Sequence, residues 1–270
     1  MHEKEASRSS MAIVLLDKHS GKRRVILENE RGTNTKYGRI SYEDAKKYLG
    51  REIPGKPLIS LPLSLRESAY QPRKYRYATQ IIYPEDRGSI ITFADIRYGK
   101  RVLEAGTGSG FLASFLTRHA SYVYTYEIRE DHYKRALRNM SLLARPDAWE
   151  IRNEDVRSFK SLGEEVDAIV LDLPEPRVVI KEIYETLKPG GRLCVLVPTY
   201  NQIEATLRVL KELPFVDIFA RENIVRDLSL KPGAIRPLHR GITFRIFMMF
   251  ARRIHGEASS SGVEDDSLDQ

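Results

Sequence analysis

A glycine-rich turn and three carboxylates are the features of this 270-residue chain best suited to bind a ligand and act on it. The turn, Gly106–Gly110, reads G-T-G-S-G; an apolar run ends just before it and a helical pattern starts just after it. A strand that passes through such a turn into a helix lets the backbone approach a ligand closely and directs free N–H groups toward it. A dinucleotide fingerprint would need glycine at position 111, where this chain has Phe111, so a nicotinamide-linked oxidoreductase is disfavoured.

The three carboxylates stand where predicted strands end. Glu127 ends the second strand of the α/β pattern, Asp155 follows the third, and Asp172 ends the fourth. Ligands of open α/β sheets bind beyond the carboxyl ends of the strands, at the point where the strand order reverses. Glu127 therefore suits the ribose hydroxyls of a nucleoside-containing cofactor, Asp155 suits the amine of its base, and Asp172 suits a substrate base. Each carboxylate could instead cap the helix that follows it.

The charge of the chain indicates an anionic partner. The net charge is +7, yet residues 256–270 hold five acids and no lysine or arginine, which leaves +12 for the rest. A body that basic favours nucleic acid, although a highly charged surface also serves solubility. Basic residues alternate with tyrosines between positions 70 and 77, a pattern that suits phosphate contacts and base stacking and equally suits a solvated connector.

Periodicity predicts two folded parts and a tail. Short strand-like runs separated by turn residues predict a small β-rich module over 1–66. Over 67–255, strands alternate with helices, which predicts a parallel sheet with helices on both faces. The pattern includes a short strand around 149–152, a helix over 177–187, a turn at 188–191, a strand over 215–221 and a loop after it. The last two apolar runs suit antiparallel pairing at the edge of the sheet. Residues 256–270 are expected to be a disordered acidic tail. No apolar run approaches a membrane span and no four-cysteine metal site is available, so we expect a cytoplasmic protein without metal.

Four segments carry a resemblance to a known family. They read T-Q-I-I-Y-P-E-D at 79–86, V-L-E-A-G-T-G-S-G at 102–110, Y-E-I-R at 126–129 and L-D-L-P-E-P at 171–176. Together they resemble the tRNA (adenine-58-N1)-methyltransferases called TrmI, over about residues 12–253. The resemblance implies a Rossmann-like class I sheet, S-adenosylmethionine (SAM) as cofactor, and a homotetramer that methylates N1 of an adenine in the tRNA T-loop. Archaeal members also modify the neighbouring adenine 57.

The resemblance and the strand-end rule together define the candidate site. Asp172 is expected to be catalytic, while the turn would hold the methionine part of SAM, Glu127 its ribose and Asp155 its adenine. The expected cofactor-binding residues are Gln80, Ile82, Glu104, Gly106, Thr107, Gly108, Ser109, Gly110, Glu127, His132, Glu154, Asp155 and Asp172. The expected tRNA-binding residues are Tyr83, Arg73, Lys74, Arg76, Arg236 and Arg240. The chain differs from the family pattern at three positions. Arg177 stands where members often have tryptophan, Ile242 where many have histidine, and Tyr83 where some archaeal relatives have histidine.

The chemistry of an adenine N1 assigns Asp172 its role. This nitrogen has its own lone pair and needs no deprotonation before it attacks a methyl group, but methylation makes the base cationic. A carboxylate that accepts a hydrogen bond from the exocyclic amine would orient the ring and stabilise the growing charge. Two alternatives stay open: an N6-adenine or other RNA methyltransferase, whose usual Asp-Pro-Pro-Tyr motif differs from Asp172-Leu-Pro-Glu, and a catalytically silent RNA-binding subunit.

Overall fold

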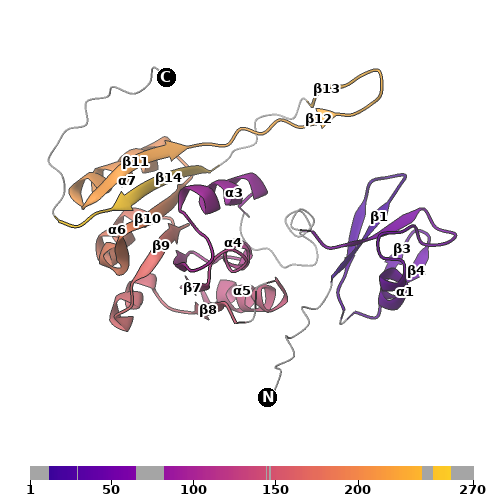
Figure 1. Ribbon diagram of the computed structural model, residues 1–270, viewed down its shortest axis with the longest axis horizontal. Helices are drawn as coiled ribbons and strands as arrows, with labels where there is room; N and C mark the ends of the chain where they lie inside the picture. The colour runs from indigo at the N-terminus through magenta and orange to yellow at the C-terminus, as the bar shows by residue number, and fades with distance from the viewer. Residues whose placement is uncertain are drawn as a thin grey trace, which may run out of the picture. The chain divides into compact units, whose positions relative to one another are not determined.

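The computed structural model describes residues 12–28, 30–64, 82–143, 145, 147–238 and 246–256, and all statements about structure concern these (Figure 1). The chain divides into two compact units, Met1–Tyr77 and Ala78–Gln270. The boundary that the sequence predicts at residue 66 lies outside the described residues, as does the predicted tail beyond Gly256.

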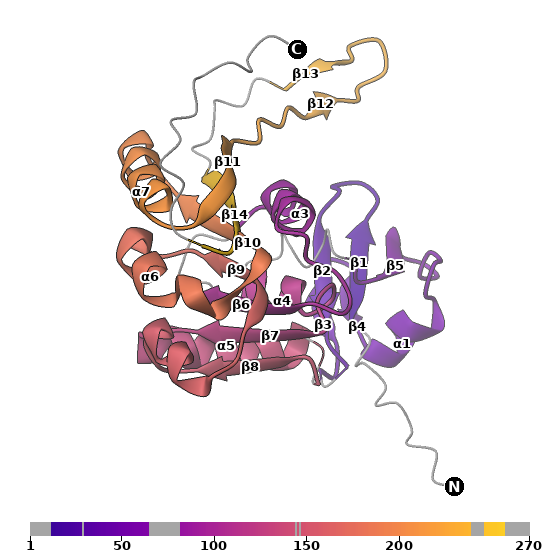
Figure 2. The ribbon, with the colours of Figure 1, turned by 60° about the vertical axis from the view of Figure 1, so that its left-hand side comes forward.

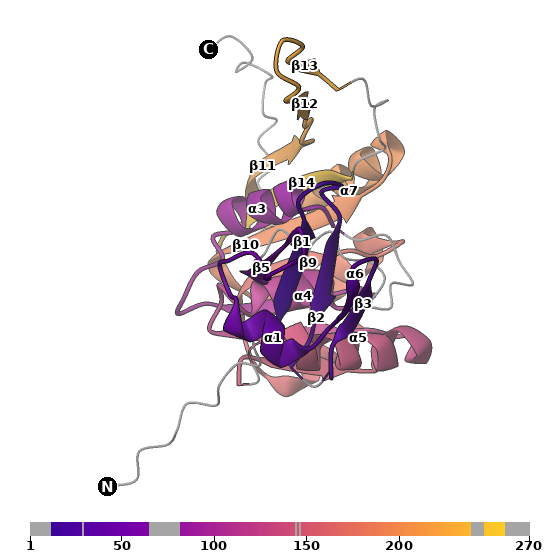
Figure 3. The same cartoon turned by 90° about the vertical axis from the view of Figure 1, so that its right-hand side faces the viewer.

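The N-terminal unit is built on a three-stranded antiparallel sheet in the order β2-β1-β5 (Figure 3). Its strands are β1 (Ile13–Asp17), β2 (Arg23–Ile26) and β5 (Leu58–Pro62); β3 (Thr33–Thr35) and β4 (Gly38–Ile40) form a separate hairpin. The helix α1 (Tyr42–Lys47) begins at Ser41, whose hydroxyl accepts a hydrogen bond from the Asp44 N–H and so satisfies a helix-end donor. Buried side chains from these elements form a core of their own.

The second unit contains a seven-stranded sheet in the order β11-β14-β10-β9-β6-β7-β8. Its strands are β6 (Arg101–Ala105), β7 (Tyr122–Tyr126), β8 (Trp149–Arg152), β9 (Val166–Leu171), β10 (Leu187–Val197), β11 (Phe215–Arg221) and β14 (Phe247–Arg253). Strands β6 to β10 are parallel, and β14 runs antiparallel between β10 and β11. The predicted α/β fold and the antiparallel pairing of the last two long strands are thereby confirmed.

Helices cover both faces of this sheet because successive strand residues point to opposite sides (Figure 2). Val102 packs in the cluster that includes Ile90 of α3 and Leu112 of α4, whereas its neighbour Leu103 packs with Ile180 of α6. The helices are α3 (Pro84–Phe93), α4 (Phe111–Leu116), α5 (Glu130–Leu143), α6 (Pro176–Ile183), α7 (Tyr200–Glu212) and the 3₁₀ helices η1 (Val156–Leu162) and η2 (Tyr184–Thr186). Among the described residues no helix has the length and apolar character to cross a bilayer.

Three local predictions need correction. The helix expected to run from 177 to 187 ends as α6 at Ile183 and tightens into η2. The turn expected at 188–191 lies within β10, whose register with β9 shifts between Leu187 and Arg192. The region expected to be a loop after β11 contains a small hairpin of β12 (Leu228–Ser229) and β13 (Arg236–Pro237), which extends away from the sheet (Figure 1).

Candidate active site

The strand order places the glycine-rich turn and Asp172 side by side. The order reverses between β6 and β9, because later strands are added outward from β6 in one direction and from β9 in the other. Ala105 at the end of β6 pairs with Leu171 at the end of β9, and the Asp172 N–H donates to the Ala105 carbonyl at 2.9 Å. The chain therefore enters the turn and the Asp172 loop at the same edge of the sheet, where ligands of such folds bind.

Gly106 is needed because the Asp172 loop lies against it. Its φ is +87°, and a Cβ at this position would lie 1.9 Å from the Asp172 carbonyl oxygen. Gly110, at the N-terminus of α4, has a φ of +80° and would bring a Cβ to 3.0 Å from the Met140 side chain on α5. The turn can therefore take its path only with glycine at these two positions, whatever ligand it holds.

A cavity of about 470 Å³ opens at this edge of the sheet. Ten predicted site residues line it: Ile82, Tyr83, Glu104, Gly106, Thr107, Gly108, Ser109, Glu127, His132 and Asp172. The structure thus brings together the residues of three separate strand ends and of the segment before α3. Gln80, Arg73, Lys74, Arg76 and Arg240 lie outside the described residues.

Three carboxylates of this cavity influence one another. Glu104 is buried, and burial raises its pKa to about 8, although hydrogen bonds from the Thr125 and Thr107 hydroxyls oppose the shift. Burial also raises the pKa of Asp172 to about 6, and the nearby charge of Glu127 adds to the effect. Asp172 is therefore mostly ionised at neutral pH, whereas Glu104 is mostly protonated.

Glu127 is held at the end of β7 by two backbone N–H groups. Its carboxylate accepts hydrogen bonds from Gly108 and from Arg129, both at 2.9 Å. His132 lies beside it, with Nδ1 3.8 Å from the carboxylate. The side chain of Ile128, which also lines the cavity, is 68% exposed. A carboxylate next to an open apolar surface matches the ribose and the base of a nucleoside, so the residues present fit the cofactor that the sequence predicts.

Asp155 and Glu154 are placed differently from the cofactor-binding expectation. The Asp155 carboxylate caps η1 by accepting the Arg157 N–H at 3.0 Å, and it pairs with the Arg157 guanidinium, which lowers its pKa. Glu154 accepts a hydrogen bond from Ser158 at 3.0 Å. Neither residue is among those that line the cavity, and both carboxylates form local contacts with residues of η1. The helix-cap alternative describes the observed contacts of Asp155.

Two other predicted residues also lie off the cavity wall. Gly110 begins α4, and Arg236 lies on β13 in the extended hairpin. The cavity is also lined by residues that the sequence did not indicate: Asp86, Phe111, Leu112, Ile128, Arg129, Leu173, Pro174, Leu196, Pro198, Gln202 and Ile246. Within the described residues no group of three side chains could hold a metal ion.

Gln202 supports the loop that carries Asp172. Its Nε2 donates to the Pro174 carbonyl at 3.2 Å, and its Oε1 accepts the Thr199 hydroxyl at 3.0 Å. The start of α7 is thereby tied to the segment that follows β9. The position of Gln202 shortly after the end of a strand was the signal that could have identified it.

Fold and site together define a class of protein. A seven-stranded sheet with one reversed strand near its edge, a glycine-rich turn after the first strand and an acid ending the second are the features of a class I SAM-dependent methyltransferase. Residues 73–243 match the family model described as tRNA methyltransferase complex GCD14 subunit. The chain belongs to this family, which confirms the resemblance seen in the sequence.

Two relatives agree with this membership. The chain is 31% identical over 208 residues to a TrmI of Methanocaldococcus jannaschii named as a tRNA (adenine(57)-N(1)/adenine(58)-N(1))-methyltransferase, covering 67% of this chain and 74% of that one. It is 34% identical over 179 residues to a tRNA (adenine(58)-N(1))-methyltransferase TrmI of Thermus thermophilus, covering 63% and 68%.

Two crystal structures have a similar fold. A SAM-dependent O-methyltransferase of Thermotoga maritima superposes with a TM-score of 0.81 at 28% identity, covering 93% of this chain and 96% of that one. The tRNA (m1A58) methyltransferase TrmI of Aquifex aeolicus gives 0.74 at 23% identity, covering 93% and 100%.

Proposed function

We propose that this chain transfers a methyl group from SAM to N1 of an adenine in the T-loop of tRNA. The observation that carries the proposal is the Asp172 carboxylate, which lines a cavity next to the glycine-rich turn in a member of a tRNA methyltransferase family. The target is adenine 58, and adenine 57 is a second target because the M. jannaschii relative is named for both positions. The expected cytoplasmic location follows from tRNA being the substrate.

The cofactor would be held by the residues at the ends of β6 and β7. SAM supplies the electrophilic methyl group when it is bound. The turn Gly106–Gly110 leaves room for its methionine part, and the Glu127 carboxylate accepts its ribose hydroxyls. Ile128 would offer apolar surface to the adenine.

Asp172 would act on the substrate base. As a carboxylate it accepts a hydrogen bond from the exocyclic amine of the adenine, which orients N1 toward the methyl group and stabilises the charge that develops on the ring. Gln202 holds the loop of Asp172 through the Pro174 carbonyl. No proton has to leave N1 before attack, so Asp172 needs to be ionised but does not act as a base. The T-loop adenine would have to be extruded from its stack to reach this position.

The other substrate contacts and the assembly are also proposals. Tyr83 lines the cavity at the start of α3 and would bear on the choice between adenines 57 and 58. Arg73, Lys74, Arg76, Arg236 and Arg240 remain candidates for backbone contacts with tRNA. A homotetramer would bury the apolar side chains that the hairpin region exposes: Ile224, Leu228, Leu230 and Ile235.

One experiment tests the reaction. The full-length protein is incubated with labelled SAM and unmodified tRNA. The modified nucleoside is then identified after complete digestion, and its position is mapped on nuclease fragments, both by mass spectrometry. We expect 1-methyladenosine at position 58 and also at position 57. N6-methyladenosine or a ribose-methylated nucleoside would replace the proposal with another RNA methyltransferase activity. Absence of transfer together with no heat on calorimetric titration with SAM would favour a silent RNA-binding subunit.

A further inference from the structure

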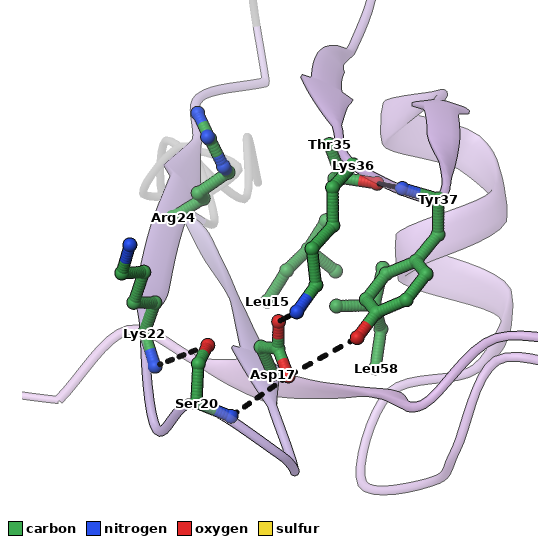
Figure 4. A pocket seen from close by; sticks show the side chains of 9 residues that line it. All are labelled: Leu15, Asp17, Ser20, Lys22, Arg24, Thr35, Lys36, Tyr37 and Leu58. Carbon is green, nitrogen blue, oxygen red and sulfur yellow. Dashed lines mark hydrogen bonds and ion pairs between the residues drawn. The ribbon is translucent and has the colours of Figure 1, made fainter.

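A second cavity, of about 190 Å³, lies within the N-terminal unit (Figure 4). It is lined by β1, β2, β3, β5 and the turns that join β1 to β2 and β3 to β4. Its lining residues are Leu15, Asp17, Ser20, Lys22, Arg24, Thr35, Lys36, Tyr37 and Leu58. We call it the module cavity. None of these residues takes part in the methyl-transfer site, so their arrangement needs a separate explanation.

The single carboxylate of the module cavity is already neutralised. One oxygen of Asp17 accepts hydrogen bonds from the His19 and Ser20 N–H groups at 2.9 and 3.1 Å and from the Tyr37 hydroxyl at 3.5 Å. The other oxygen lies 3.0 Å from the Lys36 ammonium. Burial opposes ionisation, but these partners outweigh it and hold the pKa of Asp17 well below its usual range. Asp17 therefore remains charged at neutral pH, with its charge balanced by Lys36.

The charges of two other cations in the module cavity are not neutralised by a carboxylate among the described residues. Lys22 directly precedes β2 and Arg24 lies on it, and both line the cavity on the side opposite Lys36 and Tyr37 (Figure 4). Within the described residues neither side chain forms an ion pair with a carboxylate. The lining thus has an excess charge of about +2, above an apolar floor of Leu15 and Leu58. The surrounding segment 12–64 reinforces it, with 11 lysines and arginines against six acids.

We propose that the module cavity binds a phosphodiester of the RNA backbone, with the attached ribose against the apolar floor. This inference rests on the proposed function, because it assigns the RNA substrate a contact remote in sequence from the catalytic residues. The volume is below the roughly 300–1,000 Å³ of pockets that enclose a whole small ligand, so it suits one phosphate with part of its sugar. A diester has a single negative charge, whereas free phosphate has up to two, and the Asp17 carboxylate disfavours the more highly charged anion.

The test compares two double variants of the full-length protein that remove the same charge. Lys22→Ala with Arg24→Ala removes the two cations of the module cavity that have no carboxylate partner in the described part of the chain. Lys46→Ala with Lys47→Ala removes two exposed lysines of α1 in the same unit, outside the cavity. Binding of unmodified tRNA is measured at several salt concentrations. We expect the cavity variant to bind about tenfold more weakly and to lose about one from the slope of log affinity against log salt, because one phosphate contact is lost, and the α1 variant to change far less.

Further measurements separate the possible outcomes. Lys22→Arg with Arg24→Lys keeps both charges and should retain tRNA binding, and SAM affinity should be the same in all variants. Equal tRNA binding by the wild type and the cavity variant, or an equal loss in the α1 variant, would overturn the proposal. The proposal would also be overturned if the wild type bound inorganic phosphate tightly and the cavity variant lost this binding while its tRNA affinity stayed the same. A wild type that binds tRNA but forms no 1-methyladenosine would contradict the proposed function instead, and the cavity comparison would stay interpretable.

Discussion

Replacing Asp172 by asparagine should remove most of the methyl-transfer rate and also its dependence on pH. The substitution keeps the shape of the side chain and an oxygen that can accept a hydrogen bond from the exocyclic amine. It removes the negative charge that stabilises the cationic base in the transition state. Loss of one preorganised electrostatic contact of this kind typically lowers kcat by about 10²- to 10³-fold. SAM affinity should change little, because the proposed contact of Asp172 is with the substrate.

The raised pKa of Asp172 sets the size of the pH effect. Burial raises this pKa to about 6, so about 99% of the carboxylate is ionised at pH 8 and about 9% at pH 5. If only the ionised form supports transfer, kcat/KM for tRNA should fall about tenfold between pH 8 and pH 5. The fall should begin below about pH 7 and approach one log unit per pH unit below pH 6. In Asp172→Asn the low remaining rate should show no such dependence.

The assay is transfer of label from SAM to unmodified tRNA from pH 5 to pH 9 at constant ionic strength, with SAM saturating and tRNA below its KM. Glu175→Gln is the matched control, since Glu175 lies in the same loop, is exposed and pairs with Arg177 rather than lining the cavity. It should retain the rate and the profile of the wild type. A flat wild-type profile, or an Asp172→Asn variant with unchanged kcat, would refute the electrostatic role of Asp172.

Three other substitutions test the neighbouring parts of the site. Gly106→Ala should abolish SAM binding and lower the melting temperature, because its Cβ would lie 1.9 Å from the Asp172 carbonyl oxygen. Gly99→Ala is the control, since Gly99 has a similar φ of +91° but open space around its Cβ position, so it reports backbone strain without a clash. Equal effects of the two substitutions would contradict this reasoning. Glu127→Gln should raise the Kd for SAM about 10- to 100-fold with kcat at saturating SAM nearly unchanged, as calorimetry and rates would show. Glu104 has a pKa raised by burial from 4.5 to about 8, so its contribution to stability is lost as pH rises through that range. The melting temperature of the wild type should therefore fall relative to Glu104→Gln between pH 5 and pH 9, and parallel curves would show that Glu104 does not titrate there.

Local sequence patterns were sufficient to predict most strands and helices of the second unit. The strand at 149–152 and the strand at 215–221 appear with the predicted bounds, because short apolar runs bounded by turns report burial on a sheet. Helix ends and the start of β10 were less predictable. The stretch at 188–191 has the composition of a turn, yet it enters β10 through a register shift that depends on pairing with β9. Pairing of that kind is a long-range property, which a short window of sequence does not contain.

Asp155 shows the same limit within the site. An acid that follows a strand can face a ligand or cap the next helix, and the two uses require the same residue type at the same place. The observed contacts are those of a cap, because the N–H and the guanidinium of the neighbour Arg157 both bind the carboxylate, and the adenine contact stays a prediction. The hydrogen bond of Gln202 illustrates the converse: its position after a strand end is visible in the sequence, but its acceptor, the Pro174 carbonyl, is a backbone atom that any residue type could supply.

The sequence alone determined the family and the cofactor and predicted which acid is central, because these depend on residue types at short spacings around Gly106, Glu127 and Asp172. Only the tertiary structure decided which of the candidate residues share one cavity, why Gly106 tolerates no side chain, and that Asp172 and Glu104 differ in protonation at neutral pH. It also revealed the module cavity, whose residues come from four strands and two turns. The physical reason is that steric contact, burial and the mutual influence of charges act between atoms close in space, and the packing of the sheet sets those distances.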